Sequence, residues 1–172
     1  MSSSQADLHP LRISYIVFPD GIDSNRLIFG DSVSNTDVQG YFVFNTAIGG
    51  LWDKTILSVT LKLEYPILWG DPTDRGRIQL WYNPNFVNHS ILVPDDYIIG
   101  PGSELLWLFN NRENPLIFSN EVLKNIVQDA VSIHELAGFT IRYVSKESDG
   151  DFQTDGREYF RDGITLSVVY KD

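Results

Sequence analysis

Alternating apolar and polar residues mark several stretches of this chain as β-strands with one buried and one solvent-facing side. The clearest stretch covers residues 58–65, where every second residue is apolar. Its apolar positions are Val59, Leu61, Leu63 and Tyr65, and its polar positions are Ser58, Thr60, Lys62 and Glu64. Because successive side chains of a strand point to opposite faces, this pattern predicts a strand that packs on a core through one face.

Other segments carry a strand signal between turns rich in glycine, proline and asparagine. We expect strands at residues 12–18, 41–44, 77–82, 104–110, 139–143 and 164–170. The segment 41–44 is apolar on both parities, which predicts a central strand covered on both faces. We expect a disordered arm at residues 1–10, an irregular segment at 83–102 and a long charged loop at 146–163.

One segment follows the period of a helix instead. Behind Ser119 or Asn120, either of which can supply an N-cap oxygen, apolar residues recur with helical spacing at Val122, Leu123, Ile126, Val127 and Ala130. Many short strands and a single helix predict an all-β fold, an antiparallel β-sandwich or jelly roll with one short helix. We expect residues 11–172 to form it as one domain behind the arm at residues 1–10.

Charge and cysteine content narrow the classes of partner. The formal net charge of -10 disfavours phosphate backbones and anionic lipid surfaces, so we expect no nucleic-acid partner. It is compatible with neutral glycans and with divalent cations. The absence of cysteine excludes disulfides, zinc-thiolate sites and thiol nucleophiles.

No targeting or membrane segment is recognisable. Residues 1–7 are polar and lack the apolar core of a signal peptide. No apolar run approaches the roughly 20 residues that span a bilayer, so we expect no membrane insertion. The chain is therefore expected to be either intracellular or a piece of a longer exported protein, and the sequence leaves both open.

No catalytic constellation stands out, and we expect a protein that is not an enzyme. The histidines His9, His89 and His134 are scattered and have no His or Cys neighbours at ligand spacing. Asp95 and Asp96 are adjacent, so in a strand they would face opposite sides and make a poor acid/base pair. No nucleophile elbow or phosphate-cradling glycine loop is present.

Two kinds of binding site remain. Hard cations bind several oxygens on a flexible loop, and Asp151, Asp155 and Glu158 are candidate ligands of a structural calcium ion. The oxygen-rich segment 20–25, read as a turn, is a second candidate. For both, a solvated loop is the alternative.

Sugar binding needs aromatic platforms beside hydrogen-bonding groups. Trp81 lies on the polar parity of its strand, and Trp69 lies at a turn. The candidate glycan ligands are Trp81, Trp69, Arg77, Gln79 and Asp71. For Trp52 and Trp107 we expect packing against a second layer or a covering loop instead.

The pattern as a whole resembles the DNRLRE-type domains, β-sandwich modules of exported bacterial and archaeal proteins. The resemblance spans residues 41–170 and rests on the segments 41–45, 56–63, 122–131 followed by 138–142, and 160–170. Gly40 and Tyr41 stand where the family often has an arginine, and residues 83–102 have no counterpart. The resemblance implies an accessory or structural module with an extracellular or surface-associated setting, and it carries over no catalytic residue.

Two functions follow as hypotheses. One is a non-catalytic accessory module that binds a glycan or cell-surface polymer. The alternative is a structural or assembly protein, such as a capsid, appendage or surface-layer subunit, whose partners are copies of itself. Fold class alone does not separate them.

Overall fold

Two antiparallel sheets face each other across an apolar core, as predicted for an all-β sandwich. The structure is a computed structural model that describes residues 2–17, 20–31, 37–71, 75–84, 102–133, 135–144 and 154–172. Its strands are β1 (Ser4–Leu8), β2 (Arg12–Val17), β3 (Asp20–Ser24), β4 (Arg26–Asp31), β5 (Asp37–Asn45), β6 (Thr55–Leu63), β7 (Ile67–Trp69), β8 (Ile78–Tyr82), β9 (Glu104–Phe109), β10 (Leu116–Phe118), β11 (Leu136–Tyr143), β12 (Gly156–Phe160) and β13 (Ile164–Lys171). The helix α1 spans Glu121–Ile133, and the short 3-10 turn η4 spans Arg161–Gly163.

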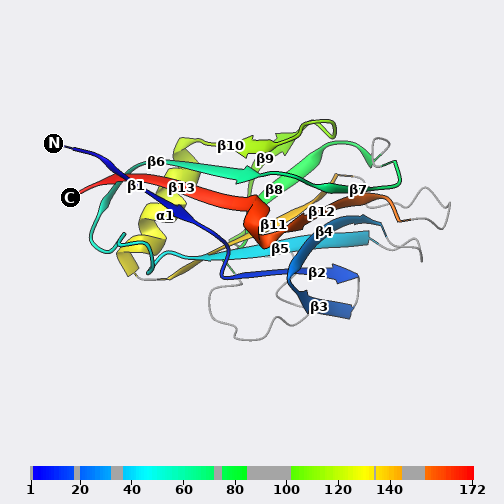
Figure 1. The fold of residues 1–172 in the computed structure, drawn as a ribbon, viewed down its shortest axis with the longest axis horizontal. Helices are drawn as coiled ribbons and strands as arrows, with labels where there is room; N and C mark the ends of the chain where they lie inside the picture. The colour runs from blue at the N-terminus through cyan, green and yellow to red at the C-terminus, as the bar shows by residue number, and fades with distance from the viewer. Residues whose placement is uncertain are drawn as a thin grey trace.

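The strand order explains which segments meet. Within the described residues, one sheet has four strands in the order β1-β13-β6-β10. The other has nine, with the path β7-β12-β4-β5-β11-β8-β9 and the hairpin β2-β3 attached through β2 to β5. Figure 1 shows the two chain ends side by side at the end of the sandwich where α1 packs, because β1 and β13 are antiparallel neighbours.

Alternate residues of the strands fill the core. Val59, Leu61 and Leu63 of β6 are buried as the alternation predicts, and they belong to the same cluster as Phe42 and Phe44 of β5. The expectation that residues 41–44 are covered on both faces is confirmed, since all four are buried. Tyr65 departs from the alternation. It lies beyond the end of β6, its backbone is in the left-handed region with a φ of 56°, and its side chain is exposed.

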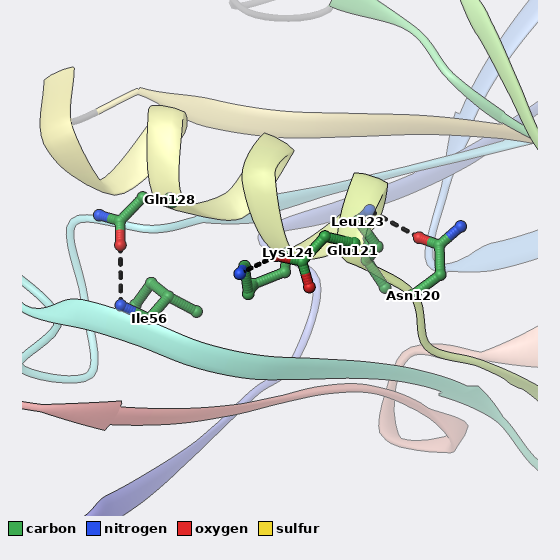
Figure 2. A network of polar contacts seen from close by, with 6 residues as sticks. All are labelled: Ile56, Asn120, Glu121, Leu123, Lys124 and Gln128. Carbon is green, nitrogen blue, oxygen red and sulfur yellow. Dashed lines mark hydrogen bonds and ion pairs between the residues drawn. The ribbon is translucent and has the colours of Figure 1, made fainter.

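The helix forms where its period predicts, and it closes one end of the sandwich. Its buried residues Leu123, Val127, Ala130 and Val131 reach the core, and it contacts β6 and β11. Asn120 caps it, because the Asn120 Oδ1 accepts a hydrogen bond from the Leu123 N–H at 2.8 Å (Figure 2). Gln128 ties the helix to β6, since its Oε1 accepts the Ile56 N–H at 2.8 Å (Figure 2).

Three predictions about irregular segments were wrong. Residues 4–8 are not a disordered arm but the edge strand β1, which pairs with β13 and buries Leu8. The supposed turn at 20–25 contains β3, and the supposed charged loop at 146–163 contains β12. All three segments are short or polar, so their local sequence carries little strand signal, and pairing with a distant strand decides their structure. The irregular segment 83–102 lies mostly outside the described residues.

Candidate functional site

A row of polar side chains crosses the face of the nine-stranded sheet that points away from the core. Gln79 and Trp81 lie on this outer face of β8, and Arg142 joins them from β11, where it pairs in register with Gln79. The Gln79 Oε1 accepts two hydrogen bonds, from the Trp81 indole N–H at 3.1 Å and from the Arg142 Nε–H at 2.9 Å. The structure thus unites two predicted ligands with an arginine that the sequence analysis missed.

The same arrangement limits what Trp81 can do. The Arg142 guanidinium carbon lies 5.6 Å from the Trp81 ring centroid, a cation–π contact that occupies one face of the indole. Burial lowers the pKa of Arg142, and the nearby Asp37 and Tyr41 oppose that shift. All three side chains of the row are half-buried. Trp81 is therefore a less open stacking platform than its polar parity suggested.

A second site lies on the edge strand β7, and we call it the tryptophan edge: Arg26, Ile67, Trp69, Glu158 and Phe160. Directly paired residues of neighbouring strands share a face, and the register pairs Ile67 with Glu158 and Arg26 with Phe160. That face points away from the core, because the alternate positions Leu27, Phe29 and Tyr159 are core residues. Four exposed side chains, those of Arg26, Ile67, Trp69 and Phe160, therefore surround the buried Glu158 on this outer face.

Trp69 is held in a fixed orientation at this edge. Its indole N–H donates to the Glu158 Oε2 at 2.9 Å, and the Glu158 Oε1 lies 3.2 Å from the Arg26 NH1. Glu158 is 1% exposed, whereas Trp69 is 42% exposed. A buried carboxylate with two partners thus anchors an aromatic ring whose surface remains accessible.

Asp71 and Asp155 meet in the turn that follows β7. The Asp71 backbone N–H donates to the Asp155 Oδ1 at 2.6 Å. Gly70 permits this approach, since a Cβ there would lie 1.7 Å from the Asp155 Oδ1. Its φ of 54° is also in the left-handed region that favours glycine. Asp155 is thereby part of the support of the tryptophan edge.

The predicted calcium ligands are only partly placed. Asp155 and Glu158 are both buried and both hold hydrogen bonds to protein groups, while Asp151 lies outside the described residues. In the part of the chain that the structure describes, no three His, Cys, Asp or Glu side chains form a group that could hold a metal ion. Calcium binding by the full set of three stays a prediction.

The five predicted glycan ligands do not form one site. Trp69 and Asp71 belong to the β7 end of the nine-stranded sheet, whereas Gln79 and Trp81 belong to β8, with β12, β4, β5 and β11 between them in the sheet order. Arg77, just before β8, instead donates through its NH2 to the Leu108 carbonyl of β9 at 2.7 Å. Pairing partners far apart in sequence decide this division.

The remaining tryptophans are more open than expected. Trp52 is 62% exposed, so the expectation that it packs under a cover is wrong. Trp107 does contact the second layer, with its ring centroid 5.8 Å from that of Phe118, but half of its surface is exposed.

Comparison with known proteins adds no family. No protein-family model matches the chain, and no curated protein matches it. The class that the structure defines is an antiparallel β-sandwich, with one α-helix in the described part of the chain. None of the helices in the described ranges has the length and apolar character of a membrane span.

Proposed function

We propose that this domain is a non-catalytic module that binds a glycan at the tryptophan edge. The observation that carries the proposal is the accessible indole of Trp69, fixed by its hydrogen bond to the buried Glu158. A fixed ring stacks on the apolar face of a sugar without losing much side-chain entropy on binding. This favours Trp69 over Trp81, whose ring is already covered on one face by Arg142.

Polar groups suited to sugar hydroxyls lie around the platform. Nearly half of the Arg26 side chain is exposed although its guanidinium also contacts Glu158. Asp71 is exposed at the end of the same edge. Ligand sites commonly combine an aromatic or apolar surface with a few placed polar groups, and the tryptophan edge has that composition.

Replacing the platform tests the proposal. We expect Trp69→Ala to weaken binding to the polysaccharide that the parent protein binds best by about thirtyfold or more, as for an aromatic hot spot worth about 2 kcal/mol. Affinity electrophoresis over a panel of neutral polysaccharides, followed by titration calorimetry, measures the effect. Trp52→Ala is the matched control, since it removes an exposed tryptophan outside this edge.

The outcomes separate the two tryptophan sites. Binding that survives Trp69→Ala but is lost in Trp81→Ala would move the ligand to the row on β8 and β11. A parent protein that binds none of the panel would contradict glycan binding at the tryptophan edge. Equal losses of polysaccharide affinity in Trp69→Ala and Trp52→Ala would show that binding does not depend on the ring of Trp69 in particular.

A second candidate function is self-assembly through β7. The three residues of this edge strand, Ile67, Leu68 and Trp69, are all exposed, and among the described residues β7 pairs with a strand on one side only. An exposed apolar edge strand is a template for pairing with another chain. This observation supports the assembly hypothesis independently of any sugar.

Light scattering coupled to size exclusion tests assembly. If β7 joins subunits, we expect oligomers of the 19.6 kDa chain that Leu68→Lys dissociates, because a charged edge residue opposes strand addition. Thr55→Lys, at an exposed position of the inner strand β6, is the control. A monomer at every concentration rules assembly out.

Running the parent protein with calcium and then with chelator also tests the predicted calcium ion. If a structural ion is bound, we expect the elution profile to change on chelation, and an unchanged profile would contradict the calcium site.

A further inference from the structure

Two exposed aromatic rings lie on the same outer face of the nine-stranded sheet, one at each end of β12. The register pairs Trp69 of β7 with Gly156, the first residue of β12, and Phe160 is the last residue of that strand. Paired residues of neighbouring strands share a face, and so do residues an even number of positions apart along one strand. Trp69 is 42% exposed and Phe160 is 47% exposed. Both rings are therefore accessible from the same side of the sheet.

The spacing of the two rings suits a chain of sugars better than a single sugar. Positions 156 and 160 are four residues apart on β12, which corresponds to roughly 13 Å at about 3.3 Å per residue. Stacked rings need centroids only about 4.5–7 Å apart, so a sugar centred on one aromatic leaves the other for a different sugar. The Trp69 indole N–H reaches toward Glu158, two positions nearer to Phe160, so the gap between the rings is shorter than that between their backbones.

The surface between the rings is built over a buried carboxylate. The strands β7, β12 and β4 lie side by side there (Figure 1), and Ile67 and Ile28 flank Glu158 in register. Trp69 and Arg26 reach the same carboxylate from either side. Glu158 itself is 1% exposed, whereas Ile67 and nearly half of the Arg26 side chain are accessible. A ligand on this strip therefore meets apolar side chains and a guanidinium group, with the carboxylate paired below them.

We propose that the tryptophan edge binds a straight, β-1,4-linked polysaccharide that runs along β12, with one sugar on Trp69 and another on Phe160. This inference rests on the proposed glycan-binding function and names the class of glycan. A β-1,4-linked chain is an extended ribbon, so it presents an apolar ring face to each aromatic and hydroxyl groups to Arg26. An α-1,4-linked chain coils, so its successive rings do not follow a strip that runs along a strand.

Oligosaccharide length and the Phe160 ring are tested together. The β-1,4-linked oligosaccharides of glucose, xylose and mannose, from disaccharide to hexasaccharide, are titrated by calorimetry. We expect the parent to bind its best hexasaccharide at least about tenfold more tightly than the matching disaccharide, because only the longer chain reaches both rings. Phe160→Ala is expected to weaken the hexasaccharide about tenfold and to leave the disaccharide unchanged, whereas Trp69→Ala weakens both. Trp52→Ala, which removes an exposed ring outside this strip, is the control and is expected to change neither.

The outcomes distinguish this inference from the proposed function. If Trp69→Ala loses binding but Phe160→Ala keeps the parent's hexasaccharide affinity, glycan binding stands and the chain along β12 is overturned. The α-1,4-linked hexasaccharide of glucose binding as tightly as the best straight one would overturn it too. A parent that binds no oligosaccharide and no polysaccharide contradicts both. Light scattering covers the other occupant, since oligomers of the parent that Phe160→Ala dissociates would assign this face to a second copy and overturn the inference.

Discussion

Phe139→Ala is expected to destabilise the fold by about 3–5 kcal/mol, the range typical of removing a buried aromatic side chain. Phe139 is fully buried at the centre of β11, between β5 and β8. Its ring centroid lies 5.5 Å from that of Phe42, 6.1 Å from that of Phe44 and 6.3 Å from that of Tyr82. Truncation removes these contacts together and leaves a cavity that three strands cannot easily close.

Urea unfolding followed by circular dichroism measures this loss. Since domains are typically stable by only about 5–15 kcal/mol, the variant is expected to unfold at a much lower urea concentration. Phe160→Ala is the control, because Phe160 is exposed on the outer face of β12 and its truncation is expected to cost less than about 1 kcal/mol. A loss at Phe139 no larger than that at Phe160 would show that the aromatic cluster is not a packing centre.

Asp31→Asn is expected to lower the free energy of unfolding by about 3 kcal/mol, the cost typical of breaking a buried ion pair from one side. The substitution keeps the shape of the side chain and an acceptor for the Asp155 N–H, which the Asp31 Oδ1 accepts at 2.9 Å. It removes the charge that faces the Arg75 NH1 at 3.0 Å, where both side chains are buried. Breaking a buried ion pair from one side is strongly destabilising, because the other charge is left uncompensated.

A double-mutant cycle tests whether this loss of stability comes from the charge of Arg75 that is left unpaired. Arg75→Met removes the stranded cation, so Asp31→Asn combined with Arg75→Met is expected to be more stable than Asp31→Asn alone. Glu64→Gln is the control for a partly exposed pair, Lys62 and Glu64, and is expected to cost about 0–1 kcal/mol. If the double variant loses as much stability as the two single variants together, Asp31 and Arg75 are not energetically coupled, which would contradict a buried ion pair between them.

The candidate sites show where local pattern stops being informative. The spacing of Gln79 and Trp81 predicts that they share a face, and they do hydrogen-bond to each other. Arg142 reaches them only because β11 pairs with β8 in a particular register. Trp69 was singled out as an aromatic residue at a turn, but its partner Glu158 lies 89 residues away in sequence. No periodicity connects two such residues.

β12 is the clearest case of a strand decided by its neighbours. Its sequence, Gly-Arg-Glu-Tyr-Phe, reads as part of a charged loop. In the fold it lies between β7 and β4, and both of its charged residues are buried. Arg157 is accommodated by carbonyl groups of residues 111 and 113, and Glu158 by Trp69 and Arg26. Because those partners come from distant segments, only the folded chain makes burial of these charges acceptable.

The sequence by itself determined the all-β class, the position of α1 with its N-cap at residue 119 or 120, and the buried face of β6. These features follow from side-chain period and capping, which act over a few residues. The tertiary structure alone decided the strand order, the strand identity of β1 and β12, and the grouping of Arg26, Trp69 and Glu158. Pairing between strands far apart in sequence brings those side chains together, and hydrogen bonds made only in the folded state hold them there.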